Sequence, residues 1–178
     1  MKKYVDVIVP LPIASQYTYS LPSDLEESVQ EGCRVVVSFG RKKFYTAIVT
    51  KVHYCDPEGY ETKDIEEVLD ASPILLPKQF EFWEWLSTYY LCTLGDVYKA
   101  AMPSGMKLES ETVVVYNEEF DATQPLSENE QRLLDLLSSD KEQCVTQLQR
   151  SIGLKNVLPV VKRLLEKEAI FVKEDLKR

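Results

Sequence analysis

The fold is decided by residues 34–52, RVVVSFGRKKFYTAIVTKV. Both ends of this stretch are rich in β-branched and apolar residues, which favours two strands. The residue between them that best fits a turn is Gly40. It is followed by a basic triplet, Arg41, Lys42 and Lys43. The pattern predicts a β-hairpin with a basic tip.

Shorter strand patterns lie on both sides of the hairpin, at residues 4–9, 17–20 and 65–69. Strands this short, separated by prolines and other turn residues, predict a small, strongly bent sheet or barrel. In the second of these strands the two-residue period places two tyrosines on one face and a threonine on the other. These residues are Tyr17 and Tyr19 on the first face and Thr18 on the second.

From Pro77 onward the apolar period becomes helical. At 100° per residue, the apolar and aromatic side chains of residues 80–90 cover an arc of roughly 220°. A helix this apolar is expected to be buried on two sides, by its own sheet and by something else such as another domain. Gly95 is expected to end this helix, and Asp96 to cap a shorter helix that reaches Met102.

The second part of the chain has the order of a winged helix-turn-helix. A strand is predicted around residues 113–116, and Ser127 and Glu130 form a capping box that opens a helix. Two more helices and a strand follow, near residues 145–152, 157–165 and 170–172. The predicted class is α+β, with a small β-rich, barrel-like domain and its C-terminal helices at 1–105 and a winged helix-turn-helix domain at 106–178.

Composition and charge restrict the function. The 178 residues are 44% hydrophobic and 28% charged, which excludes a disordered, collagen-like or disulfide-stapled chain. No apolar run approaches the roughly 20 residues that span a bilayer, so we expect a cytoplasmic protein with no membrane partner. The net charge of -8 argues against a protein that coats nucleic acid by bulk electrostatics.

The sequence offers little material for catalysis or metal binding. The four cysteines include no C-x-x-C pair, and His53 is the one histidine, so no metal site is expected. No phosphate-binding loop of the G-x-x-x-x-G-K-[ST] type occurs. We therefore expect no catalytic residue and no cofactor in this chain.

Several separated blocks resemble one protein family. They are residues 9–12 (VPLP), 17–22 (YTYSLP), 32–40 (GCRVVVSFG), 63–70 (KDIEEVLD), the pair Tyr89 and Tyr90, 95–97 (GDV) and 101–103 (AMP). In this order and spacing they are similar to the start of the bacterial primosomal proteins N′, the replication-restart DNA helicases. The resemblance is continuous over residues 4–105, and over 106–178 it rests mainly on the winged-helix pattern.

The resemblance implies a function. In that family this region is a 3′ DNA-binding domain, which holds the 3′ end of the nascent leading strand at a stalled fork, and a winged helix follows it. DNA with forks or 3′ ends is the implied partner, together with the helicase core of the same full-length chain and other primosome and single-strand-binding proteins. ATP, magnesium and zinc are expected only for the helicase portion, which lies beyond residue 178 in the family.

The resemblance also implies the residues that bind the 3′ end. They are Tyr17, Thr18, Tyr19, Gly40 and Lys63. Many members have an aspartate where this sequence has Thr18, which is neutral and can donate as well as accept hydrogen bonds. A strand end offers a base that stacks, a hydroxyl and one nearby phosphate, and these residue types suit it. With the resemblance, we favour the pocket for Tyr17 and core packing for Tyr19.

The basic residues have two interpretations. Candidates for phosphate contact are Arg41, Lys42, Lys43, Lys162 and Arg163. The first three also fit a solvated hairpin tip, and Glu166 dilutes the positive potential around the last two. An alternative function therefore stays open, in which the chain is a winged-helix adaptor or regulator whose surfaces bind protein.

Overall fold

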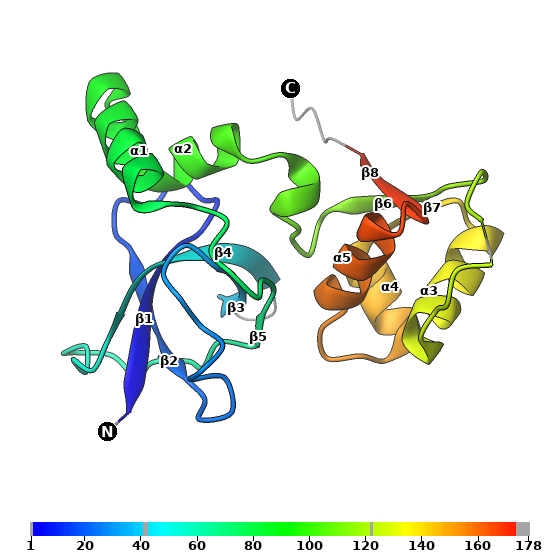
Figure 1. Cartoon of the computed structure of the whole chain (residues 1–178), viewed down its shortest axis with the longest axis horizontal. Helices are drawn as coiled ribbons and strands as arrows, with labels where there is room; N and C mark the ends of the chain where they lie inside the picture. Colours follow the sequence, from blue (N-terminus) through cyan, green and yellow to red (C-terminus); the bar gives the residue numbers. More distant parts are fainter. Residues whose placement is uncertain (1, 41–42, 122, 174–178) are drawn as a thin grey trace. The chain divides into compact units, whose positions relative to one another are not determined.

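The computed structural model describes residues 2–40, 43–121 and 123–173. The chain divides into two compact units, Met1–Pro103 and Ser104–Arg178 (Figure 1). The first unit holds an antiparallel sheet and two helices, and the second holds three helices and a small sheet. This mixture is the α+β class predicted from the sequence.

The sheet of the first unit has five strands in the order β2-β1-β4-β3-β5. Their bounds are β1 Lys3–Ile8, β2 Tyr17–Leu21, β3 Arg34–Phe39, β4 Lys43–His53 and β5 Glu67–Val68. The predicted hairpin is confirmed, because β3 pairs with β4 from Arg34↔Ile48 to Phe39↔Lys43. Lys43 therefore belongs to the strand, and the predicted tip residues Arg41 and Lys42 lie outside the described residues.

The expected barrel is not closed. Within the described chain β2 and β5 are the edges of the sheet, and one parallel bridge, Ser20↔Asp64, links the segment before β5 to β2. The strand predicted at residues 65–69 is reduced to the two residues of β5, because its neighbours bond in turn to β2 and β3. A closed barrel would need a continuous ladder of hydrogen bonds between its edge strands, but this segment divides its hydrogen bonds between β2 and β3.

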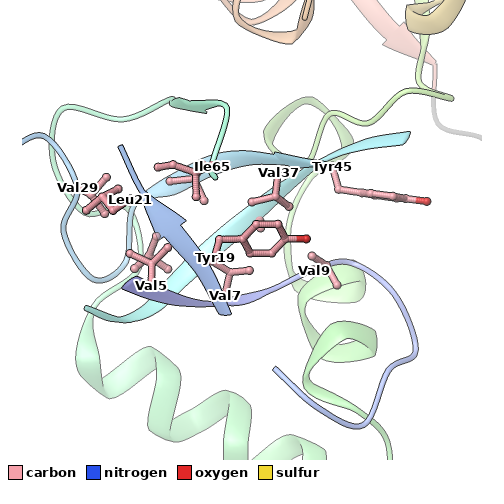
Figure 2. Packing of buried hydrophobic residues seen from close by; sticks show 12 residues of the cluster. Val5, Val7, Val9, Tyr19, Leu21, Val29, Val37, Tyr45 and Ile65 are labelled. Carbon is pink, nitrogen blue, oxygen red and sulfur yellow. The ribbon is translucent and has the colours of Figure 1, made fainter. Parts of the chain in front are cut away.

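The core of the first unit lies on one face of the bent sheet. Alternate residues of β1 to β4 meet there, and Figure 2 shows Tyr19 among Val7, Val9 and Val37. The three valines are no more than 3% exposed. This two-residue alternation is what the sequence predicts for strands that bury one face.

Two helices follow the sheet, α1 Pro77–Tyr90 and α2 Leu94–Ala101. Trp83 of α1 stacks on Tyr98 of α2 at a centroid distance of 5.8 Å, which joins the two helices. The Tyr98 hydroxyl donates to the Thr46 carbonyl of β4 at 2.7 Å, which joins α2 to the sheet. The helix boundary differs from the prediction. α1 ends at Leu91 in the left-handed conformation, Thr93 caps α2, and Gly95 lies inside it.

α1 is buried on one side in the first unit, and the expected cover of its other side by another domain stays a prediction. Trp83 is its one buried residue, and Phe82, Trp85 and Tyr89 are each more than half exposed. A helix that packs on a neighbour along one line buries only that line, however apolar its other faces are. The outer rings instead stack on one another, with centroids 6.0 Å apart for Phe82 and Trp85 and 5.1 Å for Trp85 and Tyr89.

The second unit is a winged helix. Its helices are α3 Glu128–Ser139, α4 Val145–Ile152 and α5 Leu158–Glu166, and a short 3-10 turn, η1 Ser104–Met106, precedes them. The sheet order is β7-β6-β8, with β6 Val113–Tyr116, β7 Glu142–Cys144 and β8 Ile170–Lys173. The predicted capping box at the start of α3 is confirmed. The sequence patterns missed β7, which has only three residues.

None of the helices in the described ranges is both long and apolar enough to cross a membrane.

Candidate functional site

The two tyrosines of β2 share a face but differ in environment. Tyr17 is half-buried, with its ring edge-to-face against Phe39 at 5.0 Å. Tyr19 is only 5% exposed, and its hydroxyl donates to the Ser38 carbonyl at 3.0 Å. Burial, together with the nearby phenols of Tyr17 and Tyr60, raises the pKa of Tyr19 to about 12. Tyr19 is therefore a protonated core residue, and Tyr17 is the ring that a ligand can reach.

Lys63 and Gly40 meet next to these rings. The Lys63 ammonium donates to the Gly40 carbonyl at 2.8 Å, and Gly40 directly follows Phe39. Gly40 has a φ of 68°, and apart from Gly40 and its chain neighbours no heavy atom of the described residues lies within 4 Å of where its Cβ would stand. An ammonium has three donors, so Lys63 keeps two for a ligand beside an open stretch of backbone.

The segment around Lys63 reaches this corner by pairing with β2. The Ser20 N–H donates to the Lys63 carbonyl at 2.9 Å, and the Ile65 N–H donates to the Ser20 carbonyl at 3.0 Å. The Ser20 hydroxyl also bonds to the Asp64 carboxylate. A separation of 44 residues in the sequence is closed here by strand pairing.

Thr18 lies on the opposite face of β2 from the two tyrosines, as predicted. It pairs across the strands with Asp6 of β1, and its hydroxyl donates to Asp6 Oδ1 at 2.6 Å. Thr18 as a whole is half-buried. The structure therefore brings Tyr17, Gly40 and Lys63 together and turns the Thr18 side chain away from them.

The backbone of Thr18 is nevertheless at the outer edge of β2. Both backbone groups of Ser20 bond outward, to Lys63 and Ile65. Backbone groups of residues two apart in a strand point the same way, so the N–H and C=O of Thr18 also point outward. Within the ranges described, neither has a hydrogen-bond partner. Thr18 thus offers an open donor and acceptor on the side of the strand where Lys63 lies.

Asp6 and His53 are polar residues next to Thr18 that sequence reasoning missed as site residues. His53 Nε2 lies 3.1 Å from Asp6 Oδ1, and the imidazole stacks on Tyr4 at a centroid distance of 6.1 Å. The sequence could have indicated this, because Asp6 is an acid within an otherwise apolar strand, at a position whose side chain must face away from the core.

The candidate phosphate-binding residues of α5 are engaged in ion pairs. Lys162 bonds to Glu166 at 2.9 Å on the same helix. Arg163 Nε bonds to Glu130 at 3.1 Å, and Lys167 bonds to the same carboxylate at 2.7 Å. Lys162 is thus paired one to one with Glu166, whereas Arg163 and Lys167 share the single negative charge of Glu130.

Glu130 is a buried anchor of the winged helix. Its side chain is 2% exposed. Burial tends to raise its pKa, but hydrogen bonds from Lys167, the Ser127 backbone and Arg163 outweigh burial and lower the pKa of Glu130 below its ordinary value of 4.5. Arg163 therefore has a role in stability that the sequence pattern did not reveal.

Metal-binding side chains and cavities are two further kinds of possible ligand site. Among the described residues, no group of three or more histidine, cysteine, aspartate and glutamate side chains is placed to hold a metal ion. A hollow of about 220 Å³ lies between the sheet and α1, and its lining includes Gln16, Thr50 and Phe80 but none of the predicted site residues. The aromatic and basic corner is therefore a separate place on the domain.

Comparison with known families gives two matches that divide the chain as the structure does. A model of the 3′DNA-binding domain (3′BD) of PriA matches residues 6–103, and a model of a winged helix domain matches residues 111–175. The first match covers more than half of the chain. The chain belongs to the PriA 3′DNA-binding domain family.

Curated relatives agree with this 3′DNA-binding domain assignment. Replication restart protein PriA of Haemophilus influenzae is 31% identical over 116 residues, which are 65% of this chain and 15% of that protein. PriA of Bacillus subtilis is 27% identical over 61% of this chain and 14% of its own length. PriA of Synechocystis is 28% identical over 80% of this chain and 18% of its own length. The chain thus spans less than a fifth of these relatives.

Proposed function

We propose that this chain is the DNA-binding amino-terminal part of a replication-restart helicase, and that its first unit captures the 3′ end of the nascent leading strand at a stalled fork. The match to the 3′DNA-binding domain of PriA supports a role in DNA binding during replication restart. The small share of the relatives that the chain covers supports a longer parent protein.

The observation that carries the proposal is the meeting of Tyr17, Gly40 and Lys63 at one corner of the sheet. The exposed part of the Tyr17 ring suits a terminal base, because stacking accepts any base and contributes about 1–3 kcal/mol. Lys63 suits the last phosphate, and the open backbone at Gly40 lets a sugar approach closely. The outward N–H and C=O of Thr18 add a donor and an acceptor for the edge of a base.

The acidic charge of the chain fits this mode of binding. A protein that coats a duplex must neutralise many phosphates, whereas a pocket for one strand end needs few. A net charge of -8 is compatible with the second mode and would oppose the first. We expect correspondingly weak salt dependence for binding to a free strand end.

The remaining parts of the proposal concern the longer protein. ATP, magnesium and zinc would be bound by the helicase portion and not by this chain. The helicase core and the other primosome and single-strand-binding proteins would be its protein partners.

The test is fluorescence anisotropy with short single strands that differ only at the 3′ terminus, either a free hydroxyl or a phosphate. Replacing Tyr17 and Thr18 together by alanine should weaken binding to the free 3′ hydroxyl and leave the weaker binding of the blocked strand unchanged. Equal loss on both strands would contradict recognition of the end.

A second candidate function is a winged-helix adaptor that binds protein. The ion pairs of Lys162 and Arg163 favour it, since they reduce the positive charge that α5 could offer to DNA as a recognition helix. An adaptor would show no dependence on the strand terminus in the same anisotropy experiment. The two functions are compatible if the first unit binds DNA and the second binds protein.

A further inference from the structure

The hollow between the sheet and α1 is lined by residues that the proposed function leaves unused. Its volume is about 220 Å³, and all of its lining residues belong to the first unit. Pockets that take drug-sized ligands are larger, at roughly 300–1,000 Å³. The hollow therefore suits one long side chain better than a whole small molecule.

One part of the lining is apolar. Ile8 and Leu75 are buried, and Leu94 of α2 is half-buried. The ring of Phe80 also lines the hollow and packs edge-to-face on Trp83 at a centroid distance of 6.3 Å. This surface can bury the methylene stem of a side chain and offer an aromatic ring to a cation.

The polar part of the lining includes a residue that the sheet sets apart. The pairing of β1 with β4 shifts between Asp6 and Val7, which leaves Thr50 as an extra residue on β4, a β-bulge. A bulge aims a side chain out of the regular alternation of the strand. The Thr50 hydroxyl donates to Gln16 Oε1 at 2.6 Å, and both residues line the hollow. This polar wall is therefore built into the register of the sheet.

Two carboxylates, those of Glu31 and Glu84, complete the lining. Glu31 Oε1 accepts from the Val52 N–H at 3.3 Å, which holds this side chain against β4, and Glu84 lies one helical turn after Phe80 on α1. No lysine or arginine is among the lining residues, and in the described ranges neither carboxylate has an ion-pair partner. The hollow thus combines two uncompensated negative charges with an aromatic ring and apolar walls.

We propose that this hollow is a docking site for an arginine side chain of a protein partner. Charge complementarity selects the occupant, because carboxylates without a cation of their own attract one from outside. The same charges oppose DNA, whose phosphates are negative. The lining includes none of the residues proposed to hold the 3′ end, so the inference does not depend on that proposal.

Arginine suits the lining better than lysine does. Its guanidinium is planar, carries five donors in a fixed fork, binds carboxylates with two parallel hydrogen bonds and stacks on aromatic rings. A lysine ammonium is a compact point charge that is more strongly hydrated. An arginine lying along the hollow would pack its methylenes on Ile8 and Leu75 and direct its guanidinium to Phe80 and the two carboxylates.

The experiment titrates the 178-residue chain with N-acetyl-arginine-N-methylamide, a blocked arginine, and follows the backbone amide NMR signals. We expect saturable shifts at Thr50, Phe80 and Glu84. The corresponding citrulline compound has nearly the same shape without the charge, and it should give no saturable shift. The corresponding lysine compound has the charge without the fork, and it should bind more weakly than the arginine compound.

Glu84→Gln should weaken binding of the blocked arginine about fivefold, as expected for one charge pair about 4 Å apart in water. Glu81→Gln is the matched control, because Glu81 is an exposed acid of α1 outside the lining and the change in net charge is equal. It should leave the affinity unchanged. Phe80→Leu keeps an apolar side chain without the ring and should weaken binding about two- to fivefold. The NMR spectrum of each variant shows directly whether it is folded.

Equal shifts with the arginine and citrulline compounds would overturn the inference, as would equal losses of affinity in Glu84→Gln and Glu81→Gln. Equal affinity for the lysine compound would overturn the assignment to arginine. If the chain dimerises in sedimentation and Glu84→Gln abolishes the dimer, a second copy fills the hollow and a separate partner is overturned. None of these results bears on binding of a 3′ end, which is measured separately by anisotropy.

Discussion

The edge of β2 and the helix α5 were both expected to contact DNA, but their polar groups have different partners in the structure. At the β2 edge, Lys63 is bonded to a neutral carbonyl and Thr18 has an open backbone. On α5, Lys162 and Arg163 are bonded to carboxylates of their own unit. A cation bonded to a carbonyl keeps its charge for a ligand, whereas a cation in an ion pair has its field largely cancelled. Residue type alone does not distinguish the two regions.

The largest expected effect comes from breaking the ion pairs of the second region. Glu130→Ala should lower the free energy of unfolding of the winged helix by about 3 kcal/mol, because it removes a buried carboxylate that Arg163 and Lys167 share. Thermal or urea unfolding followed by circular dichroism measures this loss. Glu128→Ala, an exposed acid of the same helix turn, is the control and should change the stability little.

The same carboxylate predicts a pH dependence. The pKa of Glu130 is lowered in the folded state, so its stabilisation is complete above its ordinary pKa of 4.5 and is lost as the pH falls through the lowered value. The difference in unfolding free energy between the parent and Glu130→Gln should therefore narrow below about pH 4.5. A difference that stayed constant from pH 7 to pH 3 would show that the ion pairs contribute nothing.

The next effect concerns the ring at the β2 edge. Tyr17→Leu keeps an apolar side chain against Phe39 but removes the stacking surface, and we expect binding of a free 3′ end to weaken by about 1–3 kcal/mol. Tyr17→Phe keeps the ring and should bind almost as the parent does. If anisotropy gives the two variants the same affinity, stacking on residue 17 is not part of the site.

A smaller effect is expected at Lys63. Lys63→Met should weaken binding of the free 3′ end by about fivefold and lower the salt dependence of log Kd by about one phosphate contact. Lys78→Met, an exposed lysine of α1, is the matched control and should change neither. Titrations at several salt concentrations separate a phosphate contact from a loss of folding, since only the first changes the slope.

The smallest effect is expected on α5. Lys162→Ala should change DNA affinity by less than about twofold, because a charge paired at i,i+4 has little field left for a ligand. A loss of fivefold or more would show that DNA competes successfully with Glu166, and would restore α5 as a recognition helix.

Much of the fold was predictable because its signals are local. The hairpin of β3 and β4, the face shared by Tyr17 and Tyr19, and the capping box of α3 all follow from residues a few positions apart. The predicted burial of α1 on its second side stays a prediction, because an apolar arc shows what a helix can bury, and not what surrounds it. The closed barrel failed for a similar reason, since strand count does not fix how the two sheet edges meet.

The sequence by itself determined the element types, the two-part order of the chain, and which side chains share a face of β2. Only the tertiary structure decided which polar groups have partners. Lys63 reaches Gly40, Thr18 faces Asp6, and Glu130 holds Arg163 across separations of 23, 12 and 33 residues. Periodicity acts over a few residues, but a hydrogen bond or ion pair depends on strand register and helix packing, which bring distant residues within 3 Å or so of each other.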